Sequence, residues 1–162
     1  NKLDYTIVFP LLIRVIINFL TFFNNDKIHQ TFLRLAVSTA MLSAVDDRFG
    51  LWAAKISVWG NMDNFLRHTQ SLLPYFPTSL ANAGGWIATL LEMVFSVCLL
   101  LGFKTELVAK LSGALIACFG LAMFTSVGLK ATFDYSVWNA VGACLAISCL
   151  KEKYWGIDSV IK

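Results

Sequence analysis

Long apolar stretches separated by groups of charged residues constrain the fold of this chain more than any other feature of its sequence. Crossing the ~30 Å hydrocarbon core of a bilayer takes roughly 20 residues of helix. Five stretches approach that length, at residues 5–23, 28–45, 81–103, 107–129 and 135–150. Because 57% of the residues are hydrophobic and only 14% are charged, the chain has too few charged side chains to cover a soluble domain. It is therefore predicted to be an all-α integral membrane protein.

The last four stretches predict a transmembrane helix bundle of four core spans over residues 28–162, with an outer-face loop at 48–80. The span at 135–150 is short, and it gains length if its helix begins near Ala131. The N-terminal segment 1–27 differs, because Pro10 and Arg14 interrupt its apolar run. We expect this segment to form a fifth span, an interfacial helix or an extension of the bundle.

Basic residues are more numerous on one side of the predicted bundle, which places the C-terminus in the cytoplasm and makes the protein multi-pass. That side carries Lys27, Arg34, Lys104, Lys110, Lys151, Lys153 and Lys162, and the other side carries Arg48, Lys55, Arg67 and Lys130. The outer loop is rich in aromatic residues, which are typical of the membrane boundary. We expect it to contain a short helix on the outer surface.

Small residues mark the predicted helix contacts. Gly113, Ala117 and Gly120 share one side of the stretch 107–129. Gly142 lies four residues before Ala146 in the last stretch, and Gly84 lies four before Ala88 in the stretch 81–103. Small residues at such spacing let membrane helices approach closely, so all three sets are expected at interfaces within the bundle.

Glu92 is a carboxylic acid in the middle of the apolar stretch 81–103. An ionised acid at that depth costs roughly 2.5–3.5 kcal/mol on insertion scales, so it should face the bundle and find a partner. A helical wheel agrees, because it separates a small and polar face from an apolar one. The first face holds Gly85, Ala88, Thr89, Glu92 and Ser96, and the second holds Ile87, Leu90, Val94, Val97 and Leu101.

Arg34 is predicted to be the cationic partner of Glu92, because the two depths differ by less than the reach of a long side chain at ~1.5 Å per residue. The pair forms a candidate intramembrane polar site. The alternative is a purely structural ion pair or a neutral, hydrogen-bonded acid.

A second group of charges lies at the outer face. Acidic residues at the end of the stretch 28–45 oppose the helix macrodipole, so something else must favour them. The candidate outward-facing polar site consists of Asp47, Arg48, Lys130, Asp134 and Tyr135. The alternative is a solvated charge cluster without a ligand.

The cysteines, the histidines and the net charge argue against several kinds of site. The four cysteines lie inside predicted spans without a Cys-x-x-Cys pair, and are expected to be inert. His29 and His68 flank opposite faces and cannot ligate one haem, so no intrinsic cofactor or metal is expected. The net charge of +3 is scattered, which disfavours nucleic acid. A quinone site is permitted, because such pockets are apolar with a few polar groups.

From about Thr31 to Asp158 the chain resembles the DoxX family of small four-span membrane proteins. The matching segments are Leu33-Arg34-Leu35, residues 44–52 (AVDDRFGLW), Trp59-Gly60-Asn61, Gly85-Trp86, residues 99–105 (LLLGFKT), Gly128-Leu129-Lys130, Phe133-Asp134-Tyr135-Ser136 and residues 151–154 (KEKY). The resemblance implies a helical protein of the bacterial inner membrane. Some relatives are associated with redox systems, including a membrane subunit linked to thiosulfate:quinone oxidoreduction.

The sequence therefore predicts an accessory membrane subunit of a quinone- or thiol-linked redox system, surrounded by the lipid bilayer. It would act with a redox partner protein or as a homo-oligomer, and not as an autonomous enzyme. Two other functions stay open. One is a structural or assembly protein, and the other is a small-molecule or ion carrier with a polar site around Glu92.

Overall fold

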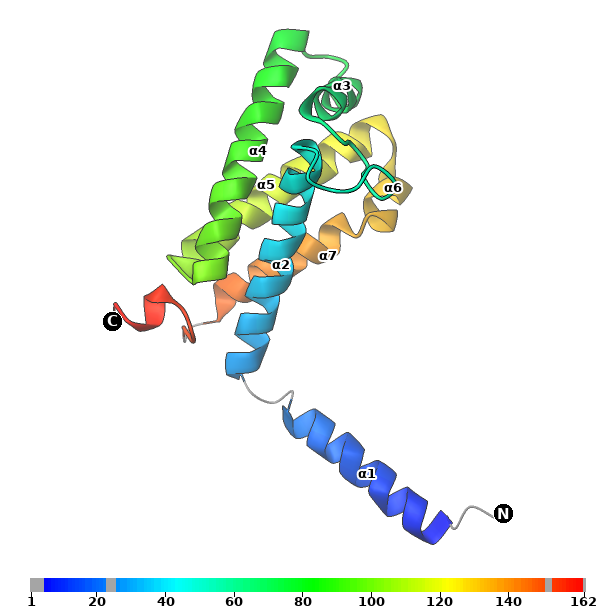
Figure 1. Ribbon diagram of the computed structural model, residues 1–162, viewed down its shortest axis with the longest axis vertical. Coiled ribbons are helices and arrows are strands. Elements are labelled where there is room, and N and C mark those ends of the chain that lie inside the picture. The colour runs from blue at the N-terminus through cyan, green and yellow to red at the C-terminus, as the bar shows by residue number, and fades with distance from the viewer. Residues whose placement is uncertain (1–4, 23–25, 151–152, 162) are drawn as a thin grey trace.

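Helices are the regular secondary structure of the residues that the computed structural model describes, 5–22, 26–150 and 153–161, and no strand occurs among these residues. The helices run in the order α1 (Tyr5–Phe22), α2 (Asp26–Arg48), α3 (Met62–Leu72), α4 (Thr78–Leu101), α5 (Thr105–Ser126), α6 (Leu129–Asp134) and α7 (Val137–Cys149), followed by a 3₁₀ turn at Ile157–Ser159 (Figure 1). The predicted all-α class is confirmed, and the short helix expected in the outer loop is present as α3.

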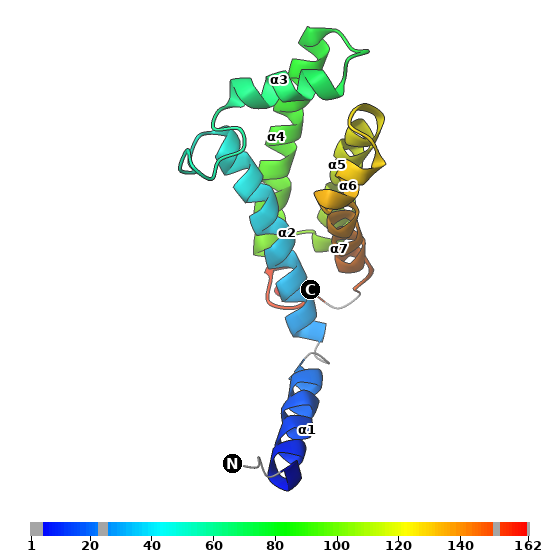
Figure 2. The same ribbon diagram turned by 90° about the vertical axis from the view of Figure 1, so that its right-hand side faces the viewer.

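Two helix pairs form the bundle. Helix α2 packs on α4, α5 packs on α7, and the contact between α4 and α5 joins the pairs (Figure 2). The buried apolar core draws on all four helices, with Met41 from α2, Leu99 from α4, Val108 from α5 and Ile147 from α7 among its members. Helix α3 lies across one end of α4.

Helix α4 has a polar interior face and an apolar exterior face, as the helical wheel predicted. The buried residues of α4 are Ala81, Gly85, Ala88, Thr89, Glu92, Ser96 and Leu99. The residues predicted to lie opposite are exposed, namely Ile87, Leu90, Val94, Val97 and Leu101. A soluble helix shows the reverse arrangement. The helix therefore packs its small and polar residues against its neighbours and leaves its large apolar residues outside.

Among the described residues, two helices are long and apolar enough to cross a membrane, α4 with 24 residues and α5 with 22. At ~1.5 Å per residue they extend about 36 Å and about 33 Å, which exceeds the ~30 Å hydrocarbon thickness. Helix α2 is also long, at 23 residues, but it is more polar.

The predicted continuous span at 135–150 is wrong as a single helix. Helix α7 begins at Val137 and has 13 residues, so it extends only about 20 Å. The residues that were to lengthen it form α6, and the chain turns between the two helices at Ser136, whose φ is 53°. A left-handed residue cannot continue a right-handed helix, which is why the span is divided.

Helix α1 extends away from the bundle in both views (Figures 1 and 2). Its described side chains include the exposed residues Phe9, Val15 and Ile17. The apolar stretch at 5–23 forms a helix over Tyr5–Phe22, and residues 1–4 and 23–25 of the N-terminal segment lie outside the described residues. It is thus a separate apolar helix attached to the bundle.

Glycines bring α5 and α7 together. A Cβ added at Gly113 would lie 3.1 Å from Cβ of Cys144, and one at Gly120 would lie 2.9 Å from Cγ1 of Val137. The predicted contact through Gly113 and Gly120 is therefore confirmed. The contacts predicted for Gly142 and Gly84 are wrong, because both residues are exposed and a Cβ at either would meet nothing within 4 Å.

The two kinds of glycine predict opposite responses to alanine. Gly120→Ala should destabilise the bundle by roughly 1–3 kcal/mol, because the methyl group would overlap Val137. Gly142→Ala should be neutral or stabilising, since alanine favours helix and the site is open. Thermal unfolding of both variants in the same detergent micelles measures the difference. Equal melting temperatures would contradict the close approach of α5 and α7.

Candidate functional site

Two buried arginines of α2 organise the two ends of the bundle. Arg34 is 3% exposed and Arg48 is 5% exposed. At ~1.5 Å per residue they lie about 21 Å apart along the helix. A buried guanidinium is costly unless its charge and its N–H groups are compensated, so the partners of each residue reveal what it does.

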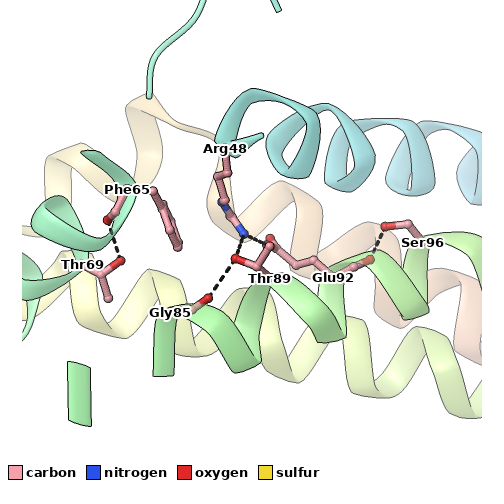
Figure 3. A network of polar contacts seen from close by, with 7 residues as sticks. All are labelled: Arg48, Phe65, Thr69, Gly85, Thr89, Glu92 and Ser96. Atoms are coloured by element: carbon pink, nitrogen blue, oxygen red, sulfur yellow. Dashed lines mark hydrogen bonds and ion pairs between the residues drawn. The ribbon is translucent and has the colours of Figure 1, made fainter. Parts of the chain in front are cut away.

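Arg48 forms a buried ion pair with Glu92 of α4. Its Nη1 donates a hydrogen bond to Oε2 of Glu92 and another, of 2.8 Å, to Oγ1 of Thr89 (Figure 3). The ring of Phe65, from α3, lies 3.9 Å from the guanidinium carbon. The last residue of α2 therefore contacts both α3 and α4 through its charged group.

The predicted pair between Arg34 and Glu92 is wrong, because Glu92 forms its ion pair with Arg48. Arg34 instead donates to backbone carbonyls at the end of α4, through Nε to Leu99 at 2.9 Å and through Nη2 to Leu100 at 3.1 Å. The last carbonyls of a helix have no partner within the helix and carry its partial negative charge. A helix C-terminus can therefore satisfy an arginine without a carboxylate.

The C-terminal segment completes the surroundings of Arg34. Nη1 of Arg34 donates to the carbonyl of Tyr154 at 2.8 Å. The carboxylate of Asp158 accepts hydrogen bonds from the amides of Lys104 and Thr105, both at 2.7 Å, where α5 begins. We call Arg34, Tyr154 and Asp158 the C-terminal clasp. It joins α2, the turn between α4 and α5, and the chain end, so Arg34 has a structural role.

The predicted outer-face site is not assembled. Asp47 accepts hydrogen bonds from the amides of Val58 at 3.0 Å and Trp59 at 2.8 Å, and therefore anchors the loop that follows α2. These bonds explain an acid at a helix C-terminus. Lys130 pairs with Asp134 at 2.6 Å within α6, which packs on α5 and α7.

The members of that predicted site therefore lie in separate places. Tyr135 follows α6 and is 75% exposed. The spacing of four residues makes Lys130 and Asp134 neighbours on one helix, which satisfies both charges locally. Arg48 is instead buried with Glu92.

A cavity of about 500 Å³ lies between α3, α4 and α5, and Arg48 is on its wall. The lining is almost entirely apolar, with Leu91, Leu115 and Phe119 among its members. Side chains with polar atoms also line it, among them Arg48, His68 and Thr69. This composition is typical of a site for an apolar small molecule.

Sequence reasoning missed the contributions of α3 to this cavity. Phe65 and His68 line it because α3 approaches α4 closely at Gly85, where an added Cβ would lie 2.6 Å from Cδ2 of Leu66. The adjacent glycines at 84 and 85 were the available signal. Burial lowers the pKa of His68, so its ring, which lies 4.6 Å from that of Trp59, is neutral at pH 7.

The remaining chemistry-bearing residues form no obvious centre. Within the described part of the chain, no group of three or more His, Cys, Asp and Glu residues is placed to hold a metal ion. The four cysteines are free thiols, and Cys118 lines the cavity. The cavity and its ion pair are therefore the candidate functional site.

The ion pair predicts a strongly non-additive double-mutant cycle. Arg48→Met should cost roughly 3–5 kcal/mol, because it leaves the Glu92 carboxylate buried without its partner. Adding Glu92→Leu should recover most of that loss. Unfolding in mixed detergent micelles provides the free energies. Additive single effects would show that the two residues do not act as a pair.

The clasp predicts a loss of stability in acid. Burial alone would raise the pKa of Asp158, but hydrogen bonds from the Thr105 and Lys104 amides outweigh it and lower that pKa. A lowered carboxyl pKa stabilises the fold at neutral pH, and this stabilisation is lost as the pH falls from about 4 through the folded value.

Two substitutions test whether Asp158 is the source of the loss of stability in acid. Asp158→Asn should lower the melting temperature at pH 7 and flatten its dependence on pH. Asp134→Asn, at an exposed pair on α6, should change neither. Melting curves between pH 7 and pH 3 make the comparison, and identical behaviour of both variants would rule out the clasp as the source.

These contacts define the site from the residues of the chain itself. Comparison of the chain with protein-family models, with curated proteins and with solved structures found no match. The cavity, the ion pair and the distribution of apolar surface are therefore the features that bear on function.

Proposed function

We propose that this chain is a multi-pass membrane protein of the DoxX type, an accessory subunit of a redox system that holds a quinone-like molecule in the cavity between α3, α4 and α5. The observation that carries this proposal is the apolar cavity of about 500 Å³ with Arg48, the partner of Glu92, on its wall. Ligand sites of this kind have volumes of roughly 300–1,000 Å³ and few polar groups. A quinone has the matching chemistry, an apolar body with two carbonyl oxygens.

The membrane setting is supported by the outer surfaces of the helices. Large apolar residues are exposed along α4 and α5, including Leu90 and Val94 on α4 and Leu111 and Phe124 on α5. In water, contiguous exposure of this kind promotes association, whereas in lipid it costs nothing. In the proposed topology α2, α4 and α5 each cross once, and α6 and α7 together make the fourth crossing.

Charge distribution supports the proposed orientation. Lys104 and Lys110 lie at the clasp end of the bundle, together with the chain end that follows α7. The positive-inside rule puts that end in the cytoplasm and α3 on the outer face. The bacterial inner membrane and the redox partner follow from the resemblance to the DoxX family, some of whose members are associated with quinone- or thiol-linked systems.

Two other functions have a specific observation in their favour. A structural or assembly role is favoured by the clasp, which uses a buried arginine only to join segments of the chain. A carrier is favoured by the presence of the Arg48–Glu92 pair beside an open cavity. Ligand binding distinguishes the proposed function from the first, and uptake by reconstituted vesicles distinguishes it from the second.

The cavity predicts that one added side chain abolishes binding without loss of fold. Gly84 lines the cavity, and a Cβ there would meet nothing within 4 Å, so Gly84→Leu should occupy the space without a clash. Gly142→Leu is the matched control, because Gly142 is an equally open helical glycine on α7. We expect binding of decyl-benzoquinone to nanodiscs to fall at least about tenfold in the first variant and to persist in the second.

Purification from the native membrane tests whether the protein has a redox partner. Mass spectrometry of the gently extracted protein should find a stoichiometric redox protein and a retained quinone. Unchanged quinone binding by Gly84→Leu, or a protein carrying bulk lipid alone, would count against the proposed function and favour the assembly role.

A further inference from the structure

We propose that the cavity selects an uncharged ligand whose head carries a hydrogen-bond acceptor oxygen, and that Arg48 donates a hydrogen bond to that oxygen from Nε. This inference rests on the proposed function, and it names the chemistry by which the same cavity would recognise its ligand.

An unsatisfied donor lies at the cavity wall. Arg48 is 95% buried, and its Nη1 is used by Glu92 and Thr89, but its Nε has no hydrogen-bond partner. Two other buried side-chain atoms lack a partner among the described residues, on Thr31 and Ser112, and neither residue lines the cavity. Buried donors in native proteins are nearly always satisfied, so an unpaired one at a cavity points to a missing acceptor.

The donor determines the type of ligand group. A guanidinium has five N–H donors and no acceptor, so it can bind an oxygen lone pair but not a hydroxyl hydrogen. A carbonyl oxygen fits this requirement. Most of the remaining lining is apolar, so the ligand body must be apolar as well.

The charge balance of the wall determines the charge of the ligand. Glu92 already offsets the positive charge of Arg48, and burial keeps His68 neutral at pH 7. A carboxylate head, such as that of a fatty acid, would add an uncompensated charge to a site of low dielectric constant. An uncharged carbonyl compound adds none. The wall therefore favours a quinone-like head over an anionic lipid.

Phe65 lies beside the group that carries the donor. The centre of its ring is 3.9 Å from the guanidinium carbon, and Nε is shielded from solvent. A ligand oxygen therefore reaches Nε only after a neighbouring side chain moves, and Phe65 is the wall residue that lies against the guanidinium. Phe65 is itself on the cavity wall, where a displaced ring can still contact a planar ligand. Binding is thus coupled to a small movement of a side chain from α3.

Competition between three matched molecules tests the inference on the intact chain in nanodiscs. Tritiated 2-decyl-1,4-benzoquinone is the bound probe, and empty nanodiscs report its partition into lipid. The competitors are the unlabelled quinone, decylbenzene without oxygens, and decanoate with a charged head. We expect the quinone to compete roughly tenfold or more better than either of the others, because only it is uncharged and accepts a hydrogen bond.

A substitution at the ion pair should reverse the preference for charge. Glu92→Gln keeps a hydrogen-bond acceptor for Arg48 but leaves its positive charge unbalanced, so decanoate should gain roughly tenfold relative to the quinone. Glu106→Gln is the control, because Glu106 is an exposed acid paired with Lys110 on α5. If Glu92→Gln fails to fold, the order of the three competitors on the unaltered chain still tests the inference about the ligand head.

The outcomes separate this inference from the proposed function. Equal competition by decylbenzene would overturn the acceptor and leave an apolar ligand site intact. Stronger competition by decanoate on the unaltered chain would overturn the requirement for an uncharged head. Probe retention no greater than in empty nanodiscs would overturn the proposed function, and this inference would fail with it.

Discussion

The buried ion pair between Arg48 and Glu92 is the interaction on which the rest of this structure depends. It joins the last residue of α2 to the middle of α4, and Phe65 of α3 lies against the same guanidinium. A buried charge that loses its partner is far more costly than a surface charge, so the pair specifies how the three helices meet. Because α3 is held there, a cavity remains between it, α4 and α5, with Arg48 on its wall.

At the other end of the bundle, the buried charge of an arginine is compensated without a carboxylate. Arg34 is satisfied by the carbonyls where α4 ends and by the carbonyl of Tyr154 in the chain end. Gly102 makes this possible, because its φ of 67° ends the helix and an added Cβ would lie 2.5 Å from Nη2 of Arg34. One arginine of α2 therefore closes the bundle, while the other borders its cavity, and only the second retains an unused donor.

Small residues connect the packing of the bundle to its cavity. Gly113 and Gly120 let α5 and α7 touch, whereas Gly84 faces open space at the cavity. Similar glycines thus serve opposite purposes, because close packing removes volume at one interface and an absent side chain preserves it at another. Large apolar residues point outward from α4 and α5, where lipid would cover them in the proposed setting.

The sequence by itself determined the helical class, the bounds of α4 and α5 to within a few residues, and the face of α4 that is buried. These properties are local, because apolar length and the 3.6-residue period are set by neighbouring residues. The partner of Glu92, the division of the last span at Ser136 and the cavity beneath α3 were decided by tertiary structure. Residue depth along separate helices could not show whether Arg34 or Arg48 pairs with Glu92. The pairing depends on how α2 crosses α4 and on which backbone carbonyls are available to Arg34 near the C-terminal segment.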